Sequence, residues 1–349
     1  MRYCSLKAFS LWLAALACLP LGSIANAGII EWVTVGDPGN TADTDSDGYG
    51  AVAASFRIAK YQFTNQQYTD FLNSVDSSGT NPYSVYNTSM GTDGRGGISL
   101  TPDAASGSKY AARSNMGDKP VEYVSWFDAA RVSNWLMNGA TSSSSTETGA
   151  YTLVGGQTSG TAPAVNSGAT FYLPTEDQWY KAAYYKGGGT SAGYWNYATQ
   201  SDLAPTAVTA DSTGNGSAGS TGNFANYDNN AVWNGQNGIV TTVGTNGGPS
   251  FYGAFDMSGN VYEWNDLTGA SGSSRGQRGG NWNGIAFLMS SSCRGSLDPE
   301  TAGLTVGFRL ASPVSGPSGV PEIDPSGLSA VLGLLFGGLG LLERRRYGR

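Results

Sequence analysis

The side chains that most enzymes use for catalysis are scarce in this 349-residue sequence. It contains no histidine and three cysteines, Cys4, Cys18 and Cys293. Without histidine, Ser-His-Asp and Cys-His chemistry and histidine-bound zinc or iron are excluded. Cys4 and Cys18 lie in an N-terminal segment that we expect to be removed. We interpret Cys293 as a small buried side chain rather than a redox nucleophile, because no histidine can lower its pKa.

Oxygen ligands for a hard cation are the strongest chemical signal that remains. Asp256 and Glu263 lie seven residues apart around a Gly259-Asn260 turn. This spacing can bring two carboxylates and several loop carbonyls onto one ion. Calcium takes roughly six to eight oxygen ligands and tolerates irregular loops, so the sequence predicts a calcium site here. The alternative is that Asp256 caps a turn and Glu263 forms a salt bridge.

The charge of the chain limits its partners. Six of the 19 basic residues and one of the 26 acidic residues lie in the two end segments, which leaves 13 basic and 25 acidic residues and a net charge near −12 between them. An acidic body of this kind argues against nucleic acid or an anionic membrane surface as a partner. With 51 glycines and only 13% charged residues, we expect a compact fold in which much of the chain is loop.

Residues 1–27 have the three parts of a secretory signal peptide. A basic start carrying Arg2 precedes an apolar run over 8–22, and Ala25-Asn26-Ala27 supplies the small residues that signal peptidase needs. A lipoprotein signal at Cys18 is the alternative, but its lipobox is imperfect. We therefore expect an exported protein that loses residues 1–27.

The C-terminus carries a second apolar segment. Residues 328–342 contain no charge, and an arginine cluster that starts at Arg344 follows them. Fifteen helical residues span about 22 Å, less than the roughly 30 Å of a bilayer core. Basic residues after the run would hold that end on the cytoplasmic side. We expect residues 328–349 to form an apolar transmembrane helix with a basic end that anchors the chain transiently, joined to the body by a flexible linker over 312–327.

Three segments of the body are predicted to be helical. Helices are expected over 64–75 and 125–137, where apolar residues recur at helical spacing after an N-capping Thr or Ser, and a third begins at Thr175, whose partner Gln178 completes a capping box. Short β-like pieces are expected in front of two of these helices, within 55–63 and 168–173.

Short phrases recur along the body in a fixed order. They are Phe56-Arg57-Ile58-Ala59-Lys60-Tyr61 with Thr64-Asn65-Gln66-Gln67-Tyr68, Lys119-Pro120-Val121 with Val124-Ser125-Trp126-Phe127-Asp128-Ala129, Leu173-Pro174-Thr175-Glu176-Asp177-Gln178-Trp179, Gly253-Ala254-Phe255-Asp256-Met257-Ser258-Gly259-Asn260-Val261-Tyr262-Glu263-Trp264, Arg278-Gly279-Gly280-Asn281-Trp282 and Gly307-Phe308-Arg309. Together they resemble the formylglycine-generating enzyme, or sulfatase-modifying factor, domain family. The resemblance covers roughly residues 32–311.

The resemblance implies a fold and a calcium site. The fold class would be α+β: a single domain related to C-type lectins, with much irregular structure, over residues 28–311. The family's calcium ligands map onto the Asp256 side chain, the Gly259 and Val261 carbonyls and the Glu263 side chain. A second calcium site of the family would lie near Asn226. Calcium is therefore the expected cofactor, in a structural role.

The resemblance also implies where catalysis would take place and why we do not expect it. Enzymes of this family hold copper between two of their own cysteines, a few residues after the Gly-Gly phrase, because soft thiolates suit Cu(I). The matching positions here are Gly284 and Met289. A lone Cys293 cannot supply two thiolates, so copper is not expected. A domain without oxidase activity is the favoured interpretation, and a formylglycine-generating oxidase acting on sulfatase cysteines is the alternative.

The C-terminal segment resembles the PEP-CTERM sorting tails that exosortases process. The resemblance depends on Val320-Pro321-Glu322, the apolar run and the arginine cluster, although Ile323 stands where the usual motif has a second proline. The expected partners are thus signal peptidase, an exosortase-type enzyme, and an extracellular polysaccharide or protein at the cell surface or in the matrix. Four aromatic residues in expected loops could stack on sugars: Trp195, Trp233, Tyr262 and Trp282.

Overall fold

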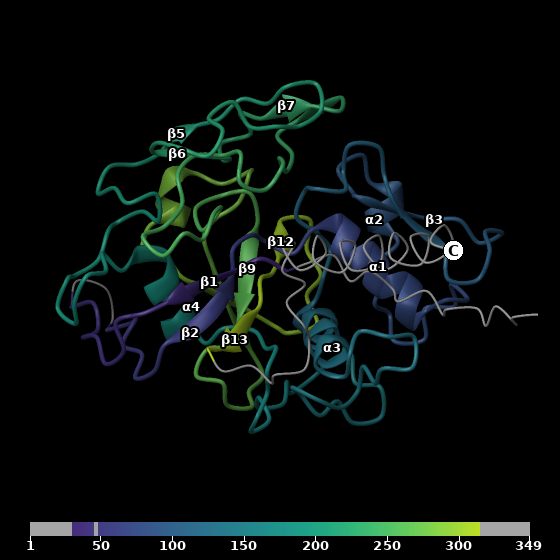
Figure 1. Ribbon diagram of the computed structural model, residues 1–349. Coiled ribbons are helices and arrows are strands. Elements are labelled where there is room, and N and C mark those ends of the chain that lie inside the picture. Colours follow the sequence, from purple (N-terminus) through teal and green to yellow (C-terminus); the bar gives the residue numbers. More distant parts are fainter. Residues whose placement is uncertain (1–29, 45–47, 315–349) are drawn as a thin grey trace, which may run out of the picture.

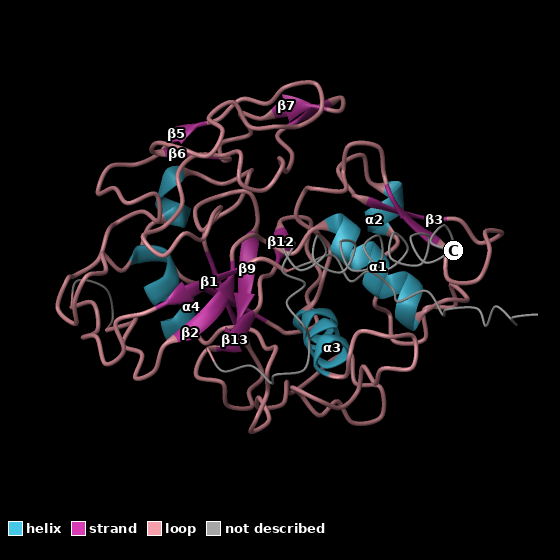
Figure 2. Cartoon of the chain, in the orientation of Figure 1, coloured by secondary structure: helices cyan, strands magenta, loops and turns pink. Residues whose placement is uncertain are grey.

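The computed structural model describes residues 30–44 and 48–314. Its helices are mostly short, and most of the chain is loop (Figure 2). The predicted 1–27 signal segment, most of the 312–327 linker and the 328–349 tail lie outside the described residues. Within the described ranges, no helix is both long enough and apolar enough to cross a bilayer.

The three predicted helices are confirmed, and each begins with a capping box. They are α1 (Asn65–Val75), α3 (Trp126–Met137) and α4 (Glu176–Tyr184), with Thr64, Ser125 and Thr175 as their N-caps. In each box the cap hydroxyl accepts the backbone N–H of the third helical residue, whose side chain accepts the N–H of the cap. Two orphan donors are thereby satisfied at each helix start. A short helix, α2 (Ser89–Thr92), was not predicted.

Two small sheets form the centre of the molecule. One has the order β1-β2-β13, and the other has the order β11-β10-β9-β12. Their strands are β1 (Trp32–Val35), β2 (Phe56–Ala59), β13 (Ala311–Pro313), β11 (Gly295–Leu297), β10 (Arg275–Arg278), β9 (Tyr262–Asn265) and β12 (Val306–Gly307). In Figure 1, α1, α2 and α3 lie on one side of the central strands and α4 lies on the other.

The C-terminal segment 306–313 belongs to both sheets. Val306 pairs in parallel with Tyr262 in β9, and Ala311 pairs antiparallel with Ile58 in β2. The first and last strands of the described chain therefore lie in one sheet, with β2 between them.

The remaining strands are two or three residues long. They form the pairs β3 (Ile98–Leu100) with β4 (Tyr110–Ala112), β5 (Thr206–Ala207) with β6 (Phe224–Ala225), and β7 (Val232–Trp233) with β8 (Gln236–Asn237). A 3₁₀ turn, η1, spans Ala286–Met289. The β-piece predicted over 168–173 is wrong as a strand, because only Tyr172 there forms a ladder contact, an isolated bridge to Ala311.

Aromatic side chains fill the core. The largest cluster joins α1 and α3 through edge-to-face packing of Phe71 on Trp135, with ring centroids 5.5 Å apart. A second cluster packs Trp179 and Tyr180 of α4 against Phe56 of β2. These cores hold the long loops that carry the candidate site.

Candidate functional site

Four of the oxygen-bearing residues predicted to bind calcium converge on one point, and a side chain occupies that point. The Gln62 side-chain nitrogen Nε2 donates to the Glu263 carboxylate Oε1 at 2.9 Å and to the carbonyls of Asp256 at 3.1 Å, Val261 at 3.2 Å and Gly259 at 3.4 Å. We call these four oxygens the oxygen cage. Gln62 follows β2 and precedes the N-cap of α1, and it is only 1% exposed.

The environment fixes which end of the Gln62 amide faces the cage. Four acceptors surround Nε2, whereas the buried Oε1 has no hydrogen-bond partner among the described residues. The opposite orientation would bring an amide oxygen against four other oxygens. The cage is therefore closed by N–H groups.

Glu263 also has a charged partner on its other side. Arg309 donates through Nε to Oε2 at 2.6 Å and through Nη2 to Oε1 at 2.7 Å, and both side chains are 0% exposed. The Trp179 indole N–H donates to Oε2 at 2.7 Å. With Gln62, four hydrogen bonds satisfy this buried carboxylate, and the guanidinium neutralises its charge. The salt-bridge alternative for Glu263 thus describes its contacts.

Asp256 and Asn226 do not direct their side-chain oxygens into the cage. The Asp256 carboxylate accepts the Gly244 N–H at 2.6 Å and the Asn246 amide at 2.8 Å, so its main-chain carbonyl, and not its side chain, belongs to the cage. The Asn226 amide donates to Asn260 Oδ1 at 3.1 Å in a separate buried network. The predicted set is thus gathered only in part.

In this arrangement the cage does not fit a calcium ion. A calcium ion sits about 2.3–2.6 Å from its oxygens and needs roughly six to eight of them, but Gln62 stands among the four oxygens available. No group of three or more Cys, Asp or Glu side chains within 30–44 and 48–314 is arranged to hold a metal ion. No local pattern in the sequence points to Gln62, because this residue lies about 200 positions from its partners.

Apolar side chains occupy the place of the family's copper-binding pair. Met289 is 0% exposed, and a Cβ added at Gly280 would lie 2.6 Å from its Cγ, so Met289 packs onto the Gly-Gly turn. A Cβ at Gly284 would lie 2.9 Å from Leu288 Cδ1. Leu288 therefore covers the space into which a cysteine at position 284 would project. These residues do not fit a two-thiolate copper site.

Cys293 is not an activated thiol. Its side chain is half-buried and unpaired with another cysteine, and burial raises the pKa of the thiol, although the nearby Arg278 opposes this shift. A raised pKa leaves little thiolate near neutral pH, and the thiolate is the reactive form.

Glu122 is a buried acid beside the same region that the sequence did not single out. Its Oε1 accepts the Trp282 indole N–H at 2.8 Å, and its Oε2 has no hydrogen-bond partner among the described residues. Burial raises the pKa of Glu122 well above its usual value, against the opposing Trp282 hydrogen bond. Arg95 lies over the Trp282 ring at 5.1 Å but donates to the Gly238 and Asn237 carbonyls.

The raised carboxyl pKa values predict that the folded protein loses stability as pH rises. Burial raises the pKa of Asp128 and of Asp266 to about 6, and raises the pKa of Glu122 strongly. The native state then binds more protons than the unfolded state between about pH 4 and these folded values. Stability is therefore fully present below the unfolded pKa values and falls as pH rises through the folded ones. We expect a progressively lower Tm from pH 4.5 to pH 8.

The Glu122→Gln variant tests the contribution of the most strongly shifted of these groups. Its Tm should exceed that of the unaltered protein by a few degrees at pH 8, and the difference should vanish near pH 4.5, because the amide stays neutral. The exposed Glu300→Gln is the matched control and should change little at either pH. A constant difference across this range would contradict a neutral Glu122.

Two of the four aromatic residues expected to meet sugars belong to the core. Trp282 and Trp233 are 2% and 5% exposed and pack with Met116 and Val261. Tyr262 is half-buried, as is Trp195, whose ring lies 4.3 Å from the Lys186 ammonium. The stacking prediction is wrong for Trp282 and Trp233, because their faces are covered.

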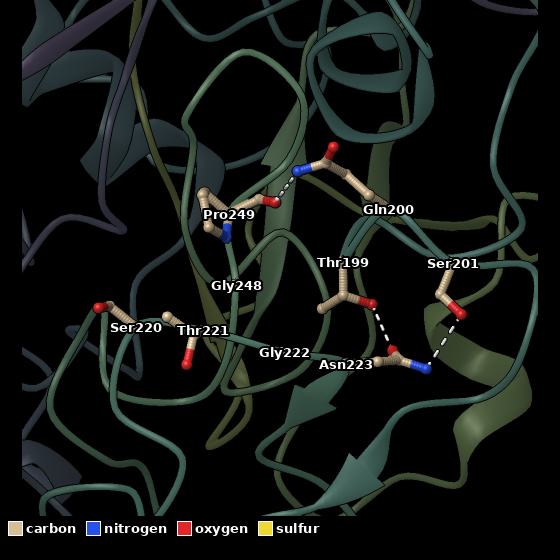
Figure 3. Close-up of a pocket in the computed structure, with 9 residues that line it drawn as sticks. All are labelled: Thr199, Gln200, Ser201, Ser220, Thr221, Gly222, Asn223, Gly248 and Pro249. Carbon is tan, nitrogen blue, oxygen red and sulfur yellow. Dashed lines mark hydrogen bonds between the residues drawn. The ribbon is translucent and has the colours of Figure 1, made fainter.

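An open polar depression of about 500 Å³ lies away from the cage. Figure 3 shows Asn223 between Thr199 and Ser201 at its edge. Asn223 accepts the Thr199 hydroxyl at 2.6 Å and donates to Ser201 Oγ at 3.0 Å, and Gln200 donates to the Pro249 carbonyl at 3.0 Å. Gly222 and Gly248 also line it. Hydroxyls, amides and bare backbone suit a neutral polar ligand.

A family of known proteins matches most of the chain. The model of the sulfatase-modifying factor enzyme 1-like domain matches residues 36–314. Among solved structures, variable protein 1 of Treponema denticola is 20% identical over 82% of this chain and 97% of that chain, with a TM-score of 0.48. CarF is also 20% identical, covering 82% and 99% at 0.47. PvdO from Pseudomonas aeruginosa is 18% identical, covering 82% and 95% at 0.43.

No protein with a curated description matches the chain. The family match spans the two central sheets, the three capped helices and both regions described above. The described chain is a single α+β domain, and the protein belongs to the sulfatase-modifying factor enzyme 1-like family.

Proposed function

We propose that the protein is an exported module of the cell surface or extracellular matrix whose domain binds or supports other molecules and does no oxidase chemistry. The observation that carries the proposal is the filled reaction centre. Leu288 and Met289 occupy the place of the copper-binding pair, and Gly284 offers no side-chain ligand. Cys293 alone cannot supply two thiolates to Cu(I).

The proposed site of action follows from the two ends of the sequence. Residues 1–27 would be removed by signal peptidase, and an exosortase-type enzyme would process the tail that begins near Val320. Calcium at the cage is not part of this proposal. The acidic body between the ends disfavours nucleic acid as a ligand.

The absence of oxidase activity is tested with the purified protein, Cu(I), oxygen and a cysteine-containing sulfatase peptide. We expect no formylglycine above the level that free Cu(I) produces, because the site lacks both thiolates. The Cys293→Ala variant is the control for adventitious thiol chemistry. Turnover that survives in Cys293→Ala would establish the alternative, an oxidase with a different copper site.

Binding is tested at the open polar depression, the described surface best suited to a neutral glycan or a polar loop of another protein. We expect glycan and extracellular-protein arrays to reveal a ligand that the Thr221→Trp variant binds at least about tenfold more weakly, since an indole at this exposed edge would fill the depression. Thr158→Trp, at an exposed position outside the depression, is the matched control. Equal binding by both variants would move the site elsewhere.

A further inference from the structure

We infer that the Gln62 side chain takes the place of a divalent cation, so that the loop 256–263 is held without metal. The four cage oxygens come from one loop and point inward, which is the arrangement that a hard cation would stabilise. Here the positive end of an amide dipole meets them. Gln62 also ties this loop to the segment between β2 and α1, far away in sequence.

The charges around the cage favour a neutral occupant. Arg309 already compensates the Glu263 carboxylate through two short hydrogen bonds. The Asp256 carboxylate, the other negative charge of the predicted site, is turned onto Gly244 and Asn246. A calcium ion would therefore add two positive charges next to a buried guanidinium, with only carbonyls left to face them. The amide closes the cage with no net charge.

The unaltered protein is tested first, with and without calcium. Its Tm should differ by less than about 1 °C between a chelator and millimolar calcium, because no cation is needed. Terbium provides a direct probe of the cage: the Trp179 indole nitrogen lies 2.7 Å from Glu263 Oε2, close enough to sensitise the emission of an ion in the cage. We expect no such emission. Saturable emission that calcium displaces and that Trp179→Phe abolishes would overturn the inference.

The Gln62→Ala variant removes the plug. Its Tm should fall by about 5–10 °C, because four buried acceptors lose their donor. Part of this loss should return with calcium, and terbium emission should appear. Gln66→Ala is the matched control, since Gln66 is exposed on α1 and its side chain donates to Asp70. Equal Tm values for the two variants would contradict the inference.

The Gln62→Glu variant keeps the shape of the side chain and so separates a loss of packing from a loss of donors. It places a carboxylate among four oxygens and should be less stable than the unaltered protein in chelator. Calcium should raise its Tm by at least about 5 °C, because a cation can now bridge the introduced carboxylate and that of Glu263. Unchanged stability of this variant in chelator would contradict the inference even if Gln62→Ala does not fold.

Discussion

Replacement of Arg309 by methionine is expected to lower the Tm of the protein by about 10 °C or more. The substitution leaves the 0% exposed Glu263 carboxylate without its counter-charge. It also removes donors from the Ala59 and Phe255 carbonyls, which accept from Arg309 at 3.0 and 2.7 Å. Breaking a buried pair from one side typically costs about 3–5 kcal/mol, and each kcal/mol shifts the Tm of a domain of this size by roughly 2–4 °C. Thermal unfolding followed by circular dichroism measures the effect.

A double-mutant cycle shows how much of this loss belongs to the pair. Arg309→Met combined with Glu263→Gln removes both charges, so the double variant should lose less stability than the two single variants together. Arg57→Met is the control, because Arg57 is half-buried and donates to Ser312 and Pro313 at the sheet edge. Strictly additive losses in the cycle would show that the pair is not coupled.

Replacement of Gly259 by alanine is expected to destabilise the fold by about 3 kcal/mol or more. Gly259 has φ +83°, a conformation that costs an L-residue about 1–2 kcal/mol. A Cβ there would also lie 2.4 Å from the Asn226 carbonyl oxygen. That oxygen accepts the Asn260 N–H at 2.9 Å and belongs to the backbone, so it cannot rotate away as a side chain could. Chemical denaturation gives the free energy of unfolding directly.

Gly168→Ala is the matched control for Gly259→Ala. Gly168 has φ +79°, and nothing lies within 4 Å of its hypothetical Cβ. This variant should lose only the conformational part, about 1–2 kcal/mol. The difference between the two variants therefore measures the clash with the chain at Asn226. Equal losses would mean that the loop 256–263 yields without cost.

Local signals in the sequence predicted the helices correctly. Thr64, Ser125 and Thr175 each begin a helix because a cap and its box partner lie within four residues of each other. Strand pairing depends on residues far apart in the chain, so the very short strands and their partners could not be predicted. The segment 168–173 has strand-like composition but only an isolated bridge at Tyr172.

The candidate site was predictable in its backbone and not in its occupant. The spacing of Asp256 and Glu263 around a Gly-Asn turn correctly indicated oxygens that gather at one point. What fills that point depends on Gln62, and which charge Glu263 meets depends on Arg309; neither has a local signature. The loss of the copper-binding pair was readable at Gly284, but the packing of Leu288 and Met289 over the gap required the structure.

The pairing of β13 with β2 has a consequence for the order in which the protein matures. Ser312 meets Arg57 across 255 residues, so the sheet β1-β2-β13 stays incomplete until nearly the whole body has been synthesised. Contacts of such long range delay folding, because the closing of a large loop must precede them. A nascent chain therefore remains unfolded while its first part is already available to the export machinery. Late closure would keep the polypeptide threadable through a narrow channel until its last strand has passed.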